Sequence, residues 1–177
     1  MTAPPEAGSK SRPRHRATVR HSAARLAAVQ AIYQLEMTES STGSVIDEFV
    51  GYRLGKADVE ASRGANANET LFKELVRGLE IRSDEVKCII EPLLAKGWAY
   101  DRLDVILRCI LRLGTSEMLS RVQVPAKVII GEYVDLADAF FSGNEPGVVN
   151  GILDRVARGA RPGELEARDD TSAHPDG

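Results

Sequence analysis

The sequence has few of the residues from which catalytic and metal sites are built. Its 177 residues include three histidines, His15, His21 and His174, and all of them lie near the two ends of the chain. No Cys/His spacing suits a zinc site, and no serine within the apolar segments has a base and an orienting group beside it. The sequence therefore predicts a protein with no enzymatic active site, no metal and no other cofactor.

Long apolar runs and paired cysteines are also missing. No segment approaches the roughly 20 apolar residues that cross a bilayer, and no basic segment followed by an apolar one opens the chain. Cys88 and Cys109 are isolated on apolar helix faces, where two buried thiols are a better interpretation than a disulfide. These absences predict a cytoplasmic protein in a reducing environment, with no membrane segment.

Acidic residues are absent between Ala7 and Leu35. This stretch carries six positive charges, at Lys10, Arg12, Arg14, Arg16, Arg20 and Arg25. Because the whole chain has a formal net charge of −3, the remainder carries −9. A basic arm on an acidic body favours binding of a polyanion at one face, although a solvated tail without a role would show the same composition.

What the sequence does contain is apolar residues at helical spacing. Spacings of three and four place them on one face in the segments 17–37, 68–95, 103–118, 125–140 and 145–157, with a shorter helix near 45–54. The residues Arg82, Ser83 and Asp84 interrupt the second segment, which is therefore either one helix or two joined by a bend. No segment alternates with period two, so the predicted fold is all-α.

The two ends are poor in large apolar residues and rich in Pro, Gly, Ser and charge. The sequence thus predicts a disordered basic arm at 1–15, a helical domain at 16–158 and a disordered acidic tail at 159–177.

Four motifs in this helical region resemble the NusB transcription-antitermination family. They are ARLAAVQAIYQ at 24–34, ILRLGTSEM at 110–118, VPAKVIIGEYVDLADAFF at 124–141 and VVNGILDRVA at 148–157. Each alone is little more than an amphipathic helix, but four in the family's order are specific. The resemblance implies a compact bundle of about seven helices in two subdomains.

The resemblance also implies a function. Members of this family are noncatalytic and bind the single-stranded boxA element of nascent ribosomal RNA together with the ribosomal protein NusE. With other Nus factors they act on RNA polymerase to suppress termination. Two alternatives stay open: the NusB-like domain of a ribosomal RNA cytosine methyltransferase, which requires a catalytic domain downstream, and a helical protein-interaction module without an RNA role.

Candidate RNA-binding residues follow from the matching motifs and from chemistry. The positions implied are Arg14, Arg16 and Arg20 in the arm, Arg25, Gln30 and Tyr33 in the first helix, and Asn144 to Val148 before the last helix. Arginines neutralise phosphates, and Tyr33 is placed either to stack an unpaired base or to be buried with its hydroxyl satisfied. Val148 stands where many members have an aromatic residue, which removes one stacking group.

The candidate partner-binding residues are Leu107 and Arg108. Leu107 stands where many members carry an acid, so a polar contact to the partner is lost there. Arg112 and Glu117 match the family motif, and we interpret them as an arginine–carboxylate network that joins helices. The sequence leaves open whether the protein forms a homodimer.

Overall fold

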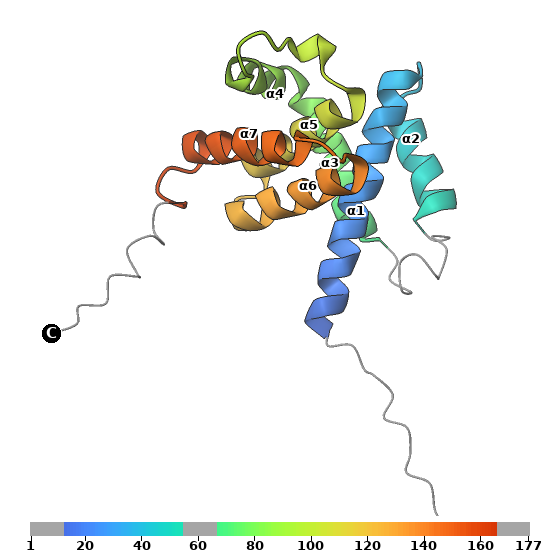
Figure 1. The fold of residues 1–177 in the computed structure, drawn as a ribbon. Helices are drawn as coiled ribbons and strands as arrows, with labels where there is room; N and C mark the ends of the chain where they lie inside the picture. The colour runs from blue at the N-terminus through green and yellow to red at the C-terminus, as the bar shows by residue number, and fades with distance from the viewer. Residues whose placement is uncertain (1–12, 55–66, 166–177) are drawn as a thin grey trace, which may run out of the picture.

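The computed structural model describes residues 13–54 and 67–165, and these form a bundle of helices with no strand between them (Figure 1). The seven α-helices are α1 (Pro13–Met37), α2 (Thr42–Glu48), α3 (Glu69–Ile81), α4 (Ser83–Ile90), α5 (Val105–Ser120), α6 (Ala126–Phe140) and α7 (Glu145–Ala160). A π-helix, η1 (Phe49–Arg53), continues α2, and two short 3-10 helices, η2 (Glu91–Leu93) and η3 (Tyr100–Arg102), lie between α4 and α5. The all-α prediction is confirmed.

Helix α5 is the centre of the bundle. It packs against α1, α3, α4, α6 and α7, and most of its residues between Leu107 and Met118 are buried. Figure 1 shows α1 and α2 on one side of the molecule and α4, α6 and α7 on the other. Because α5 contacts both groups, the buried side chains of the two groups form one continuous core.

Helix α1 packs through alanines. Ala24, Ala28 and Ala31 are fully buried, and they lie on the side of the helix that meets α3 and α5. Alanine side chains protrude little, so these helices approach closely without a cavity. The first residue of α1 is Pro13, a position that suits proline because its missing N–H has no helical partner there.

Local signals explain where several helices begin. The side chain of Asn68 accepts a hydrogen bond from the amide of Leu71 at 2.9 Å, and the side chain of Asp104 accepts one from the amide of Ile106 at 2.8 Å. Both are cap interactions that satisfy otherwise unpaired amides. The interruption at 82–84 separates two helices, since α3 ends at Ile81 and α4 begins at Ser83.

Close approach of α5 to α6 and α7 requires a glycine at 114. A Cβ atom on Gly114 would lie 2.8 Å from Cδ1 of Leu153 and 3.2 Å from Cδ2 of Tyr133. Both neighbours are fully buried, so neither has room to move away. Glycine is less favourable than alanine in a helix by about 1 kcal/mol, but at position 114 it avoids this collision and allows the helices to pack closely.

The ordered chain extends beyond the predicted domain boundary at 158. Helix α7 continues to Ala160, and Arg161 and Leu165 are buried. Arg161 donates hydrogen bonds to the carbonyl of Met118 in the last turn of α5 and to the carbonyls of Arg121 and Val124 between α5 and α6. This segment therefore stabilises the turn. We predict disorder at 1–15 and 159–177. Residues 13–15 instead begin α1, and 1–12 and 166–177 lie outside the described residues.

The two cysteines differ. Cys109 is buried in α5, and burial raises the pKa of its thiol to about 12. Cys88 is exposed, so the prediction that it is buried is wrong. Val86 and Ile90 of α4 face the core. Cys88 lies halfway between them along the helix, so its side chain points to the opposite side.

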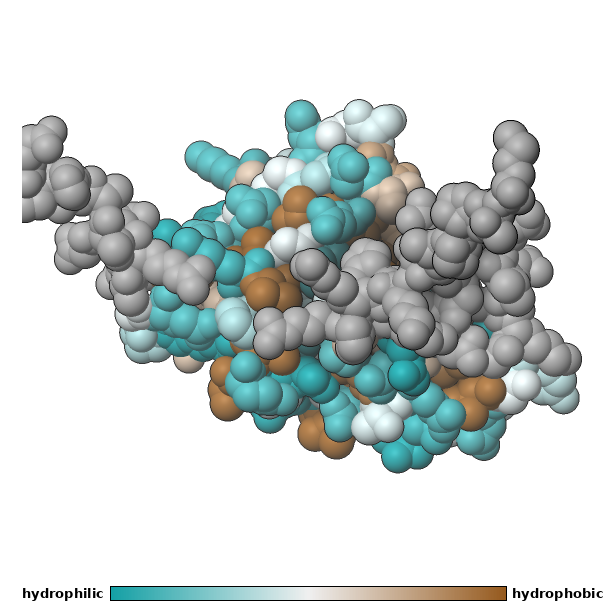
Figure 2. Space-filling view, turned by 90° about the horizontal axis from the view of Figure 1, so that it is seen from below, coloured by the Kyte–Doolittle hydropathy of each residue, from teal (hydrophilic) through white to brown (hydrophobic). Residues whose placement is uncertain are grey.

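One face of the molecule shows how apolar residues are distributed on its surface (Figure 2). Figure 2 shows brown residues in small separate groups among teal ones on the face seen from below. None of the helices in the described residues is long and apolar enough to cross a membrane.

Candidate nucleic-acid interface

The N-terminal half of α1 is joined to the core by a buried ion pair. Arg25 is 3% exposed and Glu117 of α5 is fully buried. The guanidinium of Arg25 donates two hydrogen bonds to this carboxylate, from Nε to Oε2 at 3.0 Å and from Nη2 to Oε1 at 2.7 Å. Such a two-pronged pair is the strongest geometry for arginine and carboxylate.

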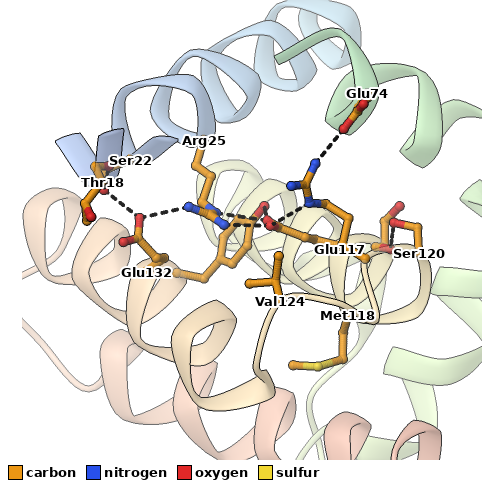
Figure 3. Close-up of polar contacts among 12 residues, drawn as sticks. Thr18, Ser22, Arg25, Glu74, Glu117, Met118, Ser120, Val124 and Glu132 are labelled. Carbon is orange, nitrogen blue, oxygen red and sulfur yellow. Dashed lines mark hydrogen bonds and ion pairs between the residues drawn. The ribbon is translucent and has the colours of Figure 1, made fainter. Parts of the chain in front are cut away.

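A second carboxylate completes the surroundings of Arg25 (Figure 3). Nη1 of Arg25 donates to Oε2 of Glu132 in α6 at 3.2 Å, and Oγ of Ser22 donates to the same oxygen at 2.7 Å. Burial works against the charged guanidinium, but the hydrogen bonds and charge of Glu117 outweigh it, so the pKa of Arg25 is raised. Arg25 therefore stays charged and is neutralised from within the protein.

Tyr133 and Arg121 extend this network. The hydroxyl of Tyr133 donates to Oε2 of Glu117 at 2.9 Å, and burial raises its pKa well above the usual value, so it stays protonated. Arg121 lies with its Nε 3.7 Å from Oε1 of Glu117 and also pairs with Glu74 of α3. The network thus ties α1, α3, α5 and α6 together, as the interpretation of Glu117 as a structural residue anticipates.

The C-terminal half of α1 has an open cavity instead. Its volume is about 420 Å³, and it lies where α1 meets η1, the start of α5 and the end of α6. The side chains that line it are Val29, Gln30, Tyr33, Gln34, Met37, Thr38, Arg53, Ile106 and Phe140. Tyr33 and Phe140 are 40% and 39% exposed, so two aromatic rings are accessible from solvent here.

Glu48 forms hydrogen bonds with two of the residues that line this cavity. Its Oε2 accepts a hydrogen bond from Nε2 of Gln34 at 2.8 Å, and its Oε1 accepts one from Nη2 of Arg53 at 3.0 Å. One carboxylate therefore positions an amide and a guanidinium on opposite sides of itself. Among the described residues that line the cavity, Arg53 is the one with a charge, and none is acidic.

The structure places the predicted RNA-binding residues in different environments. Gln30 and Tyr33 line the cavity, whereas Arg25 is enclosed by carboxylates and presents nothing to solvent. We therefore leave Arg25 out of the surface proposed below. A phosphate could reach it only by displacing Glu117 or Glu132.

The remaining candidates lie in the N-terminal part of α1 and at the start of α7. Arg14 and Arg16 belong to the first turns of α1, and their side chains lie outside the described residues; Arg20 is exposed. Asn144 is exposed at the start of α7 and makes no side-chain cap hydrogen bond, while Val148 is half-buried one turn later. Asn144 follows Phe140 of the cavity by four residues.

Leu107 and Arg108 lie beside two further cavities next to the segment 91–104. Leu107 is 3% exposed and lines one of about 310 Å³ together with Trp98 and Glu145. Arg108 lines another, of about 380 Å³, and pairs with Glu36 of α1. Arg112 pairs with the same carboxylate, so its role in this structure is to join α1 and α5.

Two residues of the main cavity escape sequence reasoning. Phe140 fits the apolar period of its helix and is predicted to be buried, but it lies at the last position of α6, beyond the core. Phe141, the C-cap residue that follows α6, is the phenylalanine that packs against the core. No feature of the sequence indicates that Arg53 lines a cavity, because the residue types do not predict a π-helix.

Comparison with known proteins gives a consistent result. The model of the NusB family matches residues 22–158. The transcription antitermination protein NusB of Maricaulis maris is 45% identical over 159 residues, which are 90% of this chain and 98% of that protein. The protein of the same name from Caulobacter vibrioides is 46% identical over 79% of this chain and 93% of its own length.

Solved structures agree with the sequence comparison. NusB of T. maritima superposes with a TM-score of 0.64 at 27% identity, covering 82% of this chain and 96% of that one. The solution structure of NusB from Aquifex aeolicus, at 23% identity, has a TM-score of 0.59 and covers 90% of this chain and 95% of its own.

Proposed function

This chain belongs to the NusB family, and we propose that it is a noncatalytic transcription antitermination factor that binds single-stranded boxA RNA together with the ribosomal protein NusE. In this role it acts on nascent ribosomal RNA transcripts with other Nus factors and suppresses termination by RNA polymerase. The names of its relatives favour this function over the methyltransferase-domain and interaction-module alternatives.

The exposed ring of Tyr33 at an open cavity is the observation that carries the RNA-binding part of this proposal. A tyrosine retained for packing is buried, as Tyr133 is, whereas Tyr33 is 40% exposed. Proteins recognise single-stranded RNA by stacking unpaired bases on such rings and by hydrogen bonds to base edges. The amides of Gln30 and Gln34 line the same cavity and supply both donors and acceptors.

The continuity of α1 links this cavity to the basic arm. The helix runs unbroken from Pro13 to Met37, so Arg14, Arg16, Arg20 and Tyr33 belong to one rigid element. At about 1.5 Å per residue, Arg20 precedes Tyr33 by roughly 20 Å. Cations at a helix N-terminus oppose the helix dipole, and a bound phosphate offsets that cost. An RNA strand along α1 would therefore meet phosphate ligands first and the base-stacking cavity afterwards.

The cavities beside Leu107 and Arg108 support a separate surface for NusE. Neither cavity shares a lining residue with the Tyr33 cavity, and Trp98 is 47% exposed at one of them. Exposed tryptophan and arginine are the residue types that contribute most to protein interfaces. A surface distinct from the RNA cavity allows RNA and protein to bind together.

The test is binding of a short single-stranded boxA RNA, with and without NusE, across a series of salt concentrations. Antitermination function predicts affinity that increases with NusE, decreases with salt and prefers boxA over a scrambled sequence. Salt-dependent binding without sequence preference or a NusE effect would contradict it, and so would the absence of binding. Sedimentation of the same samples measures whether the protein is a homodimer when RNA or NusE is absent.

A further inference from the structure

The cavity beside Tyr33 contains a cation that the family motifs do not point to. Arg53 lies in η1, far from the basic arm in sequence, and its side chain is half exposed. Its guanidinium reaches the same cavity as the rings of Tyr33 and Phe140. One site therefore combines two accessible aromatic faces, two amides and one positive charge.

The π-helix is what brings Arg53 to this position. A π-helix has wider turns than an α-helix and places residues five apart on one side. Glu48 and Arg53 are five apart, and their side chains are hydrogen-bonded at 3.0 Å. In a regular α-helix this separation would turn the two side chains away from each other.

Arg53 also makes a cation–π contact with one ring of a stacked aromatic pair. Its guanidinium carbon lies 4.5 Å from the centre of the Phe49 ring, and that ring stacks on Phe72 with centroids 5.5 Å apart. Phe49 and Phe72 are both fully buried, so the platform is rigid. Arg53 is thus fixed by a cation–π contact and by the ion pair with Glu48, and little side-chain entropy is lost when it binds a ligand.

Most of the hydrogen-bonding capacity of Arg53 remains available. A guanidinium has five N–H donors, and among the described residues Arg53 uses one of them, at Nη2, for Glu48. Arg53 lines a cavity whose other described lining residues carry no charge. A fixed guanidinium beside accessible rings matches the chemistry of one nucleotide, which offers an anionic phosphate next to a flat base.

We propose that this cavity binds one nucleotide of the RNA, with the base against Tyr33 and Phe140 and the adjacent phosphate held by Arg53. This inference rests on the RNA-binding function proposed above and adds a phosphate ligand outside the basic arm. Because η1 supplies Arg53 while α1 and α6 supply the rings, the bound nucleotide bridges both sides of the bundle.

The experiment compares wild-type protein with Arg53→Gln and, as a matched control, Arg77→Gln, an exposed arginine of α3 that lies outside the cavity. Each is titrated with a fluorescent single-stranded boxA RNA in several salt concentrations. Arg53→Gln should weaken binding roughly three- to tenfold at low salt and reduce the salt slope by about 0.7, the value for one phosphate on a single strand. Arg77→Gln should change neither quantity.

A second measurement identifies the phosphate. A set of RNAs, each with one uncharged methylphosphonate linkage, is tested against wild-type protein and Arg53→Gln. One linkage should weaken wild-type binding but leave binding by Arg53→Gln unchanged, because the variant no longer contacts that phosphate.

The outcomes separate this inference from the function on which it rests. If wild-type protein binds boxA RNA and Arg53→Gln binds it equally well with an unchanged salt slope, the Arg53 inference is wrong and RNA binding stands. If wild-type protein binds no RNA, both are wrong. Unfolding by urea provides the remaining control, since Arg53→Gln should be as stable as Arg77→Gln to within about 1 kcal/mol.

Discussion

Arg25 and Arg53 show how differently one molecule uses two arginines. Arg25 comes from the acid-free basic segment, yet it lies in the interior between Glu117 and Glu132. Arg53 comes from a segment without a basic character, yet it lies half exposed at a cavity with accessible rings. The basic composition of a segment therefore does not indicate which of its arginines can reach a ligand.

The same contrast divides α1 into two halves. The N-terminal half, around Ser22 and Arg25, is fixed to α5 and α6 by ion pairs, whereas the C-terminal half, around Gln30 and Tyr33, forms the wall of an open cavity. We infer that the ion pairs around Ser22 and Arg25 determine the position of the helix, and that the C-terminal half contacts the bases of the RNA. Substitutions in the two halves should therefore affect different measurements.

The largest expected effect is on stability, from Glu117→Gln. The substitution leaves the buried charge of Arg25 without its main partner, which typically costs about 3–5 kcal/mol. Urea denaturation should show this loss. Glu74→Gln is the matched control, because Glu74 is 54% exposed in its pair with Arg121 and such pairs contribute about 1 kcal/mol or less. Equal losses in the two variants would mean that the buried network does not fix α1.

The next effect is on RNA affinity, from Tyr33→Ala. Loss of one base-stacking ring costs about 1–3 kcal/mol, so affinity for boxA RNA should fall roughly 5- to 150-fold while the unfolding midpoint changes little. Tyr33→Phe should retain most of the affinity because it keeps the ring. Tyr52→Ala, which alters a tyrosine outside the cavity that is 69% exposed, should bind as wild type does. A Tyr33→Ala variant with normal affinity would remove the basis for the distinction between the two halves.

Substitutions of two glycines distinguish the effect of packing on stability from the effect of helix propensity. Gly114→Ala should destabilise the protein by about 1–3 kcal/mol, because the added methyl group collides with Leu153 and Tyr133. Gly131→Ala should instead stabilise it by roughly 0.5–1 kcal/mol, since Gly131 lies in α6 with no atom near its Cβ position. Thermal unfolding of both variants measures the difference. Stabilisation by Gly114→Ala would show that α5 does not need its close contact with α7.

The smallest expected effect is a pH dependence from His21. Burial, followed by the charges of Arg25 and Arg121, lowers its pKa in the folded protein below the ordinary value of 6.5. The unfolded chain then binds more protons than the folded one as the pH falls through 6.5, so acidification reduces stability and raising the pH restores it. The unfolding temperature measured between about pH 5.5 and 7.5 should depend less on pH in His21→Asn than in wild type. An unchanged pH dependence would show that His21 does not respond to the buried network.

Features that depend on residues close in sequence could be predicted. The interruption at 82–84 marks the boundary between α3 and α4, and the apolar spacing identifies α5 as a core helix. The role of Glu117 in a buried arginine network also follows from the family motif. The partner of Glu117 does not, because Arg25 lies 92 residues away and only the packed fold shows that the two meet.

The candidate site was less accessible to sequence reasoning than the fold. Tyr33 and Gln30 were found because their motif matches, but whether the ring of Tyr33 is buried depends on which helices cover it. Arg53 depends on a π-helix, whose extra residue per turn leaves no pattern in the sequence. Phe140 is the last residue of α6, where the apolar period continues but the core does not.

Photo-crosslinking of boxA RNA to the full chain tests the central claim most directly. With a photoreactive uridine placed in turn at each position of the RNA, mass spectrometry identifies the protein residues that contact each base. We predict crosslinks to Tyr33 or Phe140 from one position of the RNA, and none to the residues around Arg25. Crosslinks confined to other helices, with none at the Tyr33 cavity, would contradict the assignment of base contacts to the C-terminal half of α1.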